Sequence, residues 1–414
     1  MTNIPAEIVI IGGGIIGCTT AYYLTQHPKV ISGDAKITLI EASVKGPAQG
    51  ASGKAGGLVA RWAYPKEIVD VSFDEHVKLA EAHGGKDRWG WRFVGCGSWE
   101  GRAQAPLPPR EDEGVSGNKS LEKELGLPGA QKPRKGTKAE GKSRKDVGLP
   151  DDLLWVDEAL TDSYSPMARK GDTAQVHPYQ FTTSMFELAK SSGLNYIHGK
   201  VTSILKEGGK VTGVQYTDPN TNTSQTKHAT HVLLCAGAWS PNVISELPIS
   251  ATRAHSITIR PKPDVQIAPY VLFTEISDLS SKAHSSPEIY ARPDNEVYAC
   301  GPGDDYPLPA TVDEVVVDAK SCDLIHKHVS SISKELREGT VEKRQACYLP
   351  SVTTGGGPII GEASMIAKGL YIGTGHTCWG ISNGPGTARA LCELIMDGKV
   401  KCANLRKLSP SALL

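Results

Sequence analysis

The sequence lacks an excess of charge of either sign. Lys and Arg together number 45, Asp and Glu together number 45, and the formal net charge at pH 7 is therefore zero. A neutral chain produces no overall field that would attract nucleic acid or an anionic membrane. We therefore expect no nucleic-acid partner, unless a local basic segment recruits one.

The sequence also lacks an apolar run long enough to cross a membrane. The nearly apolar stretch closest to the N-terminus, residues 8–18, contains three consecutive glycines and follows no basic segment. A membrane-spanning helix needs about 20 apolar residues, and a signal peptide starts with a basic region. The final residues, Ser-Ala-Leu-Leu, differ from a peroxisomal signal of the Ser-Lys-Leu type. We expect a soluble, cytoplasmic protein without a membrane span.

The sequence also lacks paired cysteine motifs. The nine cysteines are scattered, without a C-x-x-C pair or the His spacing of a zinc site. This pattern favours a reducing compartment, buried thiols and no bound metal. The 414 residues suffice for about two to three domains, so a disulfide-stapled miniprotein is excluded.

The N-terminal segment has the pattern of a strand–helix–strand unit. A β-branched run at 7–11 ends in glycines, an apolar helix-like stretch follows at 15–26, and a second strand follows at 36–40. This order requires a parallel sheet. The fold class that we predict is therefore α/β.

The turn between the first strand and the helix fits the motif G-x-G-x-x-G. Gly12 would allow the turn, Gly14 would let a pyrophosphate approach the backbone, and Gly17 would let the helix pack on the strand. The phosphates would then lie at the positive helix N-terminus. Glu41, at the end of the second strand, is placed to accept hydrogen bonds from a ribose. These features predict a dinucleotide; the alternative is a glycine-rich turn without a ligand.

NAD and FAD share this motif, so the rest of the chain must distinguish them. The loop at 50–58 has small residues that would let the backbone lie close to a flat ring, and it is not a P-loop, because Ala48 and Ala55 replace required residues. The segment 373–380 again leads from a strand, 370–372, into a helix that reaches about Met396. Its N-terminal dipole could stabilise negative charge on a reduced flavin. Two helix N-termini far apart in the chain favour a long cofactor.

Between these ends, the segment 101–150 stands out. Gly and Pro supply 14 of its 50 residues, aromatics are absent, and 132–145 holds seven Lys or Arg against one acid. We expect a mobile basic surface insertion, with order returning at Asp152. A nucleic-acid or membrane role for the basic run is the alternative, although no aromatic is interleaved for stacking.

The remaining segments alternate helices and strands. Pro178 occupies the expected start of a helix that covers 181–190. Strands are predicted at 201–205, 211–216, 228–234, 288–292 and 296–300, and a helix at 321–336. The first three strands form a meander that leads into Cys235-Ala236-Gly237, which is unusual for a plain NAD-binding domain.

Taken together, the 12–17 motif with Glu41, the 50–58 loop, the 231–239 stretch and the 373–386 stretch resemble the FAD-dependent D-amino-acid oxidase, glycine oxidase and sarcosine oxidase superfamily, most closely a fungal group within it. The resemblance covers most of the chain outside 101–150. It implies a Rossmann-type FAD-binding domain with a β-meander, plus an α+β substrate domain whose mixed sheet covers the flavin. The FAD-binding domain would be built from 1–90, 166–245 and 341–414, and the substrate domain from 91–165 and 246–340.

The motifs and the resemblance together give a set of candidate cofactor residues. Val201 would contact the adenine through its backbone, and Ala236 and Gly237 would line the phosphates. The full set is Gly12, Gly14, Ile15, Ile16, Gly17, Glu41, Ala42, Ser43, Ser52, Gly53, Lys54, Ala55, Gly56, Gly57, Leu58, Val201, Ala236, Gly237, Trp239, Cys347, Gly375, His376, Thr377, Cys378, Trp379, Gly380 and Ile381.

The residues that would hold a substrate depart from the family pattern. Where glycine-oxidase-type enzymes carry an Arg-Pro pair that binds a carboxylate, this chain has Leu349-Pro350. Arg61, in an Arg-x-Ala-Tyr sequence like that of sarcosine oxidase, and Arg292, on a strand expected to face the ring, could substitute, because a guanidinium binds an anion through two hydrogen bonds. The alternative for each is a structural ion pair. A second carboxylate-binding lysine of sarcosine oxidase corresponds to Ser382.

Three further residues have open roles. In the sarcosine and fructosyl-amine oxidase branch, a cysteine near the position of Cys347 forms a thioether to the flavin; the alternative is an inert buried thiol. His376 would position the ring or cap the helix rather than transfer a proton. Trp379 would form a wall of the substrate pocket or pack beneath it.

The function implied by the resemblance is oxidation of a small amine or amino-acid-like substrate at a carbon–nitrogen bond, with hydride transfer to flavin and then to oxygen or another acceptor. No Lys lies between residues 288 and 304, where one activates oxygen in sarcosine oxidase, so oxidase and dehydrogenase both stay open. Oxidation of a hydroxyl-bearing carbon is an alternative. A flavin-bearing scaffold or trafficking factor that uses the basic insertion is another. The sequence does not predict the oligomeric state.

Overall fold

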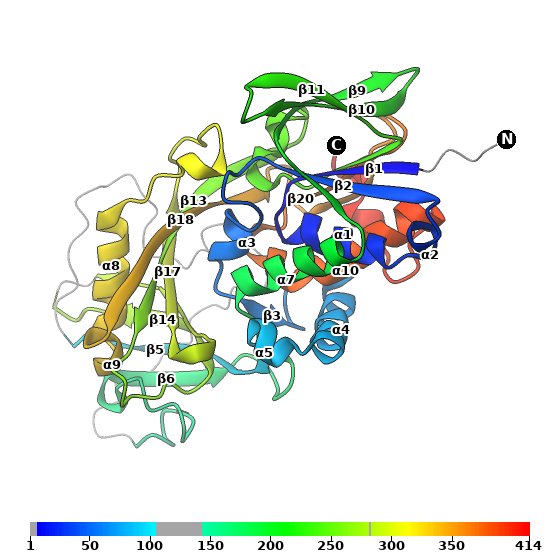
Figure 1. Cartoon of the computed structure of the whole chain (residues 1–414). Helices are drawn as coiled ribbons and strands as arrows, with labels where there is room; N and C mark the ends of the chain where they lie inside the picture. The colour runs from blue at the N-terminus through cyan, green and yellow to red at the C-terminus, as the bar shows by residue number, and fades with distance from the viewer. Residues whose placement is uncertain (1–5, 105–142, 281–282) are drawn as a thin grey trace.

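The computed structural model describes residues 6–104, 143–280 and 283–414 (Figure 1). A six-stranded sheet has the order β19-β20-β12-β1-β2-β8, in which β19 alone is antiparallel to its neighbour. Its strands are β1 Ala6–Ile11, β2 Ala35–Glu41, β8 Asn195–His198, β12 His231–Leu234, β19 Ile359–Glu362 and β20 Leu370–Thr374. This is the parallel α/β arrangement that the sequence predicts.

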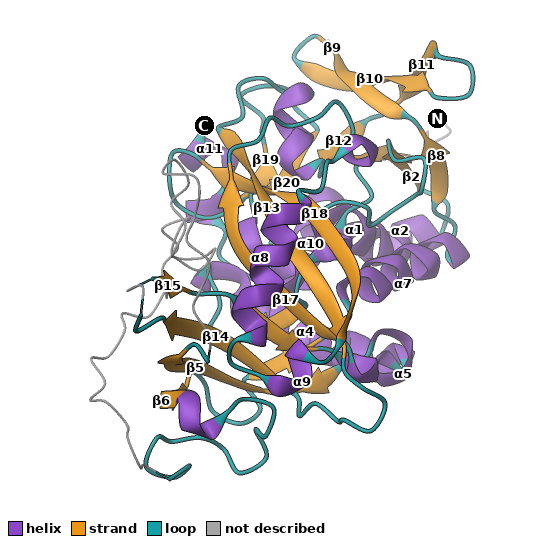
Figure 2. Ribbon diagram, turned by 90° about the vertical axis from the view of Figure 1, so that its left-hand side faces the viewer, coloured by secondary structure: helices purple, strands orange, loops and turns teal. Residues whose placement is uncertain are grey.

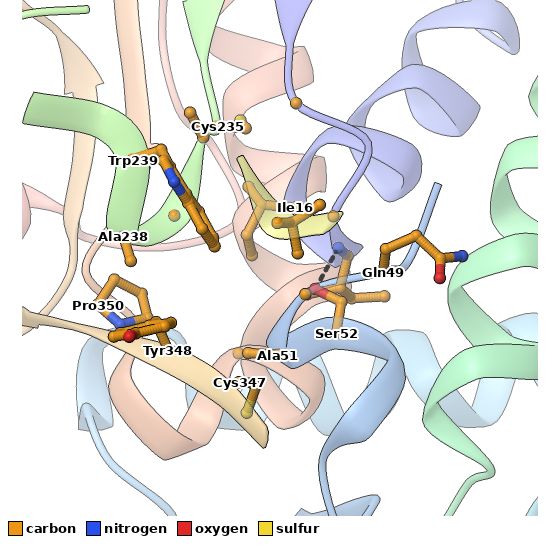
Figure 3. A pocket seen from close by; sticks show the side chains of 18 of the residues that line it. Ile16, Gln49, Ala51, Ser52, Cys235, Ala238, Trp239, Cys347, Tyr348 and Pro350 are labelled. Carbon is orange, nitrogen blue, oxygen red and sulfur yellow. Dashed lines mark hydrogen bonds between the residues drawn. The ribbon is translucent and has the colours of Figure 1, made fainter. Parts of the chain in front are cut away.

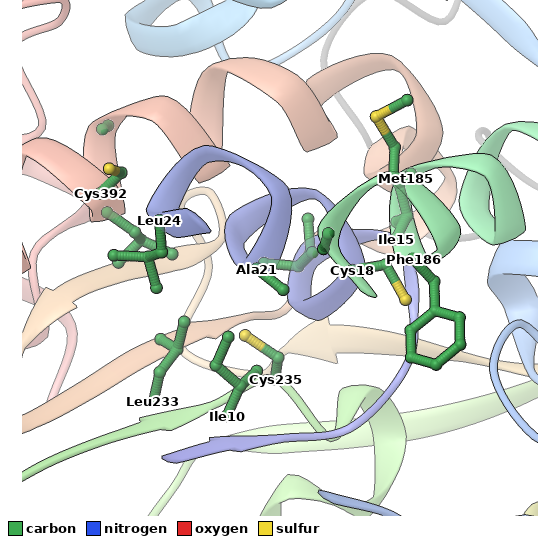
Figure 4. Close-up of a cluster of buried hydrophobic side chains, with 14 of the residues drawn as sticks. Ile10, Ile15, Cys18, Ala21, Leu24, Met185, Phe186, Leu233, Cys235 and Cys392 are labelled. Carbon is green, nitrogen blue, oxygen red and sulfur yellow. The ribbon is translucent and has the colours of Figure 1, made fainter. Parts of the chain in front are cut away.

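Both faces of this sheet are covered, as the apolar strands require. On one face, Ile8 and Ile10 pack with Leu24 and Met185 from the helices (Figure 4). These helices are α1 Ile15–Thr25, α7 Pro178–Ser191 and α10 Gly380–Asp397. On the other face, Val9 packs with residues of a three-stranded meander, β9 Lys200–Glu207, β10 Lys210–Asp218 and β11 Thr223–His228. The alternation of strand side chains therefore separates two cores.

The predicted strand at 228–234 is wrong in its bounds. Thr223–His228 pairs within the meander as β11, and the chain then enters the six-stranded sheet as β12. The residues of β11 are polar and mostly exposed, so the strand carries no alternating apolar signal. The predicted helix starting at Pro178 and the strands at 7–11 and 36–40 are confirmed to within about two residues.

A second, mixed sheet has the order β18-β13-β17-β16-β14-β5-β6, with β15 paired to β14. One of its faces packs on α8 Ala319–Ser330 (Figure 2). The predicted helix at 321–336 is two helices, because Ser333 caps α9 Lys334–Arg337 by accepting a hydrogen bond from the Leu336 N–H at 3.2 Å. The strands are β5 Gly95–Arg102, β6 Thr161–Pro166, β13 Ile249–Arg260, β14 Tyr270–Ser277, β15 His284–Ser285, β16 Glu288–Ala291, β17 Val297–Asp304 and β18 Thr340–Val352.

The expected insertion at 101–150 is too wide at both ends. Residues 101–102 belong to β5, and Val147 and Leu149 are buried beside the second sheet. Val147 accepts a hydrogen bond from the Tyr164 N–H at 2.7 Å through its carbonyl, so the chain is ordered before Asp152. Residues 105–142 of the predicted insertion, which include most of its basic run, lie outside the described residues.

A third small sheet and several helices join the two large sheets. This sheet has the order β3-β7-β4, from Leu58–Ala60, Thr173–Gln175 and Arg92–Phe93. No helix in the described ranges is both long and apolar enough to span a membrane. The remaining helices are α2 Pro28–Ile31, α3 Ala51–Lys54, α4 Lys66–His83, α5 Gly85–Trp89 and α11 Pro410–Leu413.

Candidate active site

One cavity runs from the carboxyl ends of β1, β2 and β12 to the face of the second sheet (Figure 3). Its walls come from segments that are far apart in the sequence: the β1–α1 turn, the 48–56 segment, the start of β9, the β12 end, strands β16 to β18, and the β20–α10 turn. This edge of a parallel sheet is where α/β proteins bind ligands. The cavity is therefore the candidate active site.

The β1–α1 turn has the geometry of a phosphate cradle. Gly12 has a φ of +104°, and a Cβ there would lie 2.6 Å from the Cys235 carbonyl oxygen. A Cβ on Gly17 would lie 2.0 Å from the Gly12 carbonyl oxygen, so side chains are excluded at both positions. The hydroxyl of Ser52 accepts a hydrogen bond from the Ile15 N–H at 2.9 Å, at the first turn of α1. The first turn of α1 lines the cavity, where the positive end of the helix dipole suits an anion.

Glu41 connects this turn to the end of β2. Its Oε2 accepts a hydrogen bond from the Gly13 N–H at 2.5 Å, and its Oε1 accepts one from the Ser43 N–H at 2.8 Å. Burial raises the pKa of the Glu41 carboxyl above its ordinary value, against the opposite effect of these backbone donors. The carboxyl group lines the cavity beside the glycine turn. Its contact with a ribose stays a prediction.

Most of the predicted cofactor residues line this cavity. They are Gly12, Gly14, Ile15, Ile16, Glu41, Ala42, Ser52, Ala55, Gly56, Val201, Ala236, Gly237, Trp239, Cys347, Gly375, His376, Thr377, Cys378, Gly380 and Ile381. The predicted residues that are not part of the lining are Gly17, Ser43, Gly53, Lys54, Gly57, Leu58 and Trp379. Close packing explains two of the latter, since a Cβ on Gly53 or Gly57 would lie 2.0 Å from a carbonyl oxygen.

Neither predicted anion-binding arginine lines the cavity. Arg61 forms an ion pair with Asp74 at 2.6 Å and lies over the Phe73 ring. Arg292 forms a buried ion pair with Glu296 at 2.8 Å and donates to the Ala55 carbonyl oxygen. The alternative that the sequence left open for each, a structural ion pair, is the arrangement observed. The strand before Arg292, β16, lines the cavity through Glu288 and Tyr290, whereas the Arg292 guanidinium is held by carboxylate and backbone acceptors.

The β20–α10 turn forms the opposite end of the cavity. His376 is buried, its Nε2 lies 3.1 Å from the Thr387 hydroxyl, and burial lowers the pKa of its imidazole to about 3. The ring is therefore neutral at physiological pH. Trp379 packs edge-on against Trp62 at 5.6 Å between ring centroids and is 4% exposed. Trp379 is not part of the cavity lining. Its role as a wall of the substrate pocket or as packing beneath it stays a prediction.

Cys347 and its neighbours lie on β18. The Cys347 thiol lines the cavity opposite Ala51 (Figure 3). Burial raises the pKa of this thiol to about 11, although the nearby Lys54 ammonium acts in the opposite direction. Lys54 donates to the Ala346 carbonyl oxygen at 3.0 Å. No group of three His, Cys, Asp or Glu in the described part of the chain could hold a metal ion.

Sequence reasoning missed a polar part of the wall. Glu288 and Tyr290 of β16 and Tyr298 and Cys300 of β17 line the cavity. The available signal was the two-residue alternation of a strand, which puts residues 288, 290 and 292 on one face.

Three features of the cavity are typical of a dinucleotide-dependent redox enzyme. They are the glycine turn at the N-terminus of α1, the acidic group at the end of β2, and the N-terminus of α10 at the same cavity. The chain belongs to the FAD dependent oxidoreductase family, whose sequence pattern matches residues 7–394. It is an FAD-dependent oxidoreductase. The cavity fits this cofactor for two reasons. The turn is formed by glycines at positions where a Cβ would collide with the backbone, so no side chain stands there, and the lining is continuous from this turn to the second sheet.

Similar proteins agree with this family. The chain is 32% identical to the protein named "Putative oxidoreductase TDA3" of Saccharomyces cerevisiae, over 98% of this chain and 94% of the yeast protein. Iminodiacetate oxidase from Chelativorans sp. BNC1 has a TM-score of 0.65 at 18% identity, covering 97% of this chain and 98% of its own. Fructosyl amine: oxygen oxidoreductase from Aspergillus fumigatus has a TM-score of 0.67 at 16% identity, covering 98% and 89%. The two structures show the shared fold.

Proposed function

We propose that this FAD-dependent oxidoreductase oxidises a small amine or amino-acid-like molecule at a carbon–nitrogen bond. The observation that carries the proposal is one continuous cavity, which joins the glycine turn at α1 to a polar wall on the second sheet. Bound FAD would supply a hydride acceptor. The names of the structural relatives, an iminodiacetate oxidase and a fructosyl amine oxidoreductase, support a nitrogen-bearing substrate.

The chain's own residues would mainly bind and orient. The N-terminus of α10 points its positive dipole end toward the cavity, next to Thr377 and Cys378. The neutral imidazole of His376 is held by Thr387 and suits a positioning role rather than proton transfer. Apolar lining such as Leu349 would keep water from the reacting carbon. Orientation of a substrate by such a wall contributes to rate without a catalytic dyad.

The domain division and the location of the protein are part of the same proposal. We infer an FAD-binding domain from 1–90, 166–245 and 341–414 and a substrate domain from 91–165 and 246–340. The strands of the six-stranded sheet, β1, β2, β8, β12, β19 and β20, all fall in the first set, which supports the division, whereas β18 of the same set pairs in the second sheet. A cytoplasmic location and a thioether through Cys347 are further hypotheses.

Anaerobic reduction of the purified holoenzyme tests the function. Loss of the flavin absorbance near 450 nm, roughly the flavin band, is followed after addition of matched pairs such as benzylamine and benzyl alcohol, or pyrrolidine and cyclopentanol. The proposal expects bleaching by the amines, faster than by the alcohols. The second candidate is oxidation of a hydroxyl-bearing carbon, favoured by the two arginines being held in ion pairs. Bleaching by the alcohols alone would replace the first proposal with the second.

A further inference from the structure

The wall that the second sheet gives to the cavity carries an acidic side chain. Glu288 lines the cavity and is 5% exposed. Its Oε2 accepts a hydrogen bond from the Tyr290 hydroxyl at 2.6 Å, and the Cys300 sulfur lies 3.8 Å from the same oxygen. Tyr290 packs edge-on against Tyr298, at 5.4 Å between ring centroids. The carboxylate is therefore fixed in direction by side chains of its own sheet.

In the part of the chain that the structure describes, no Lys or Arg side chain is part of this wall. Among the residues that the structure describes, Lys200 is the one Lys or Arg in the lining. It lies on β9, next to Gly199, whose N–H donates to the Glu41 carbonyl at the nucleotide end of the cavity. Arg292 pairs with Glu296 and lies over the Tyr298 ring, at 4.6 Å from its centroid.

The position of the expected carboxylate clamp is apolar. Leu349 and Pro350 line the cavity, and Leu349 is 6% exposed. A substrate carboxylate in this cavity would leave water for an apolar surface and would approach the Glu288 carboxylate. Burying an anion without a partner, near a like charge, is strongly unfavourable.

We propose that this cavity selects an amine without a carboxylate, and that Glu288 accepts hydrogen bonds from the cationic nitrogen of that amine. This assignment rests on the proposed function and names its substrate class. A carboxylate has about four lone-pair positions, so the bond from Tyr290 leaves capacity for a ligand. A hydrogen bond between an ammonium group and a carboxylate is about twice as strong as a neutral one. Tyr290 is a positioning residue that holds the carboxylate.

The experiment compares amines with their carboxylated analogues on the purified, FAD-loaded full chain. Benzylamine is compared with phenylglycine, pyrrolidine with proline, and benzoate serves as an anion without nitrogen. Dissociation constants are read from shifts of the flavin absorption spectrum without oxygen, and bleaching rates are recorded separately. We expect each amine to bind at least about tenfold more tightly than its amino acid, since a hydrogen bond to a charged group contributes about 1.5–3 kcal/mol.

Variants attribute the selectivity to Glu288. Glu288→Gln is expected to weaken amine binding about 10- to 100-fold and to strengthen benzoate binding, because the negative charge is lost. Tyr290→Phe should weaken amine binding by about two- to fivefold, because the carboxylate loses one orienting donor. The matched control is Glu342→Gln, an exposed glutamate that pairs with Arg260 on the second sheet outside the cavity, and it should change nothing.

The possible outcomes distinguish a failure of this assignment from a failure of the proposed carbon–nitrogen oxidation. Amino acids that bind as tightly as their amines, amines that cause no spectral shift, or Glu288→Gln with unchanged amine binding would each overturn the assignment. Bleaching by amino acids in preference to amines would leave carbon–nitrogen oxidation standing while removing the role of Glu288. Bleaching by alcohols alone would remove the function itself. The wild-type comparison needs no variant, so a Glu288→Gln chain that fails to fold leaves the test intact.

Discussion

The Ser43 hydroxyl donates a hydrogen bond to Asp313 at 2.7 Å, although the two residues are 270 positions apart. The Val44 N–H donates to the other carboxylate oxygen of Asp313 at 2.9 Å. Asp313 belongs to the segment 305–318, here called the strap, which leads from β17 to α8. Trp239 and Tyr348 also hold the strap, by donating to the carbonyl oxygens of Pro309 and Pro307. The strap residues 310–312 line the cavity, so the strap closes it beside the nucleotide end.

Replacing Asp313 with Ala is expected to speed FAD release. The change removes two hydrogen bonds to a carboxylate, each of which contributes about 1.5–3 kcal/mol, so release is expected to be at least about tenfold faster. Release is measured by the return of FAD fluorescence after dilution of the holoenzyme. Asp305→Ala changes an exposed residue of the same strap and should leave the rate unchanged. Equal rates for the wild type and Asp313→Ala would show that the strap does not retain the cofactor.

Arg61→Met tests whether this half-buried arginine binds substrate. Arg61 is paired with Asp74, and an exposed ion pair contributes about 1 kcal/mol or less. We expect the KM and kcat/KM for the best amine to stay within about twofold of the wild type. Arg389→Met is the control, since Arg389 has a similar exposure and pairs with Glu75. A 10- to 100-fold rise in KM for an amino acid, seen in Arg61→Met alone, would restore the carboxylate-binding role.

The sequence predicted the features of the fold that are determined by residues close together in the chain. The β1–α1 unit, the glycine turn and the helix that starts at Pro178 depend on neighbouring residues, and all three are observed. The roles of Arg61 and Arg292 could not be read locally, because their carboxylate partners are chosen by tertiary packing. The strap contact between Ser43 and Asp313 joins distant segments without a motif. Strand alternation could place Glu288 on one face of β16, but only the packing of two sheets determines that this face meets the cavity.

Acid should destabilise the fold through its buried histidines. His76 is 1% exposed, its Nε2 lies 2.9 Å from the Ile381 carbonyl oxygen, and burial lowers its pKa to about 4. The unfolded chain would protonate this residue near pH 6.5, so its contribution to stability is full above pH 6.5 and is lost as the pH falls toward 4. At pH 5 the loss is about 2 kcal/mol.

Urea unfolding at pH 7 and pH 5 measures this effect. His76→Gln is expected to lose about 2 kcal/mol less than the wild type between the two pH values, because glutamine does not titrate. His228→Gln, at an exposed position on β11, should keep the wild-type acid sensitivity. Identical pH dependence in His76→Gln and the wild type would mean that the buried imidazole does not resist protonation.

The Cys347 thiol is the candidate for a covalent bond to FAD. A thioether requires the thiolate, and with a pKa of about 11 that form is about one molecule in 10,000 at pH 7 and about one in 100 at pH 9. We therefore expect attachment of the flavin to Cys347 to be slow at pH 7 and about a hundredfold faster at pH 9. The experiment is done in air, because oxygen reoxidises the flavin that the reaction reduces.

The holoenzyme is held at each pH and precipitated with acid, and the colour of the washed pellet reports bound flavin. Cys378→Ser, a cavity cysteine outside β18, should behave as the wild type, whereas Cys347→Ser should give a colourless pellet at both pH values. A wild-type pellet that is colourless even after pH 9 would exclude the thioether and leave Cys347 as a buried wall residue.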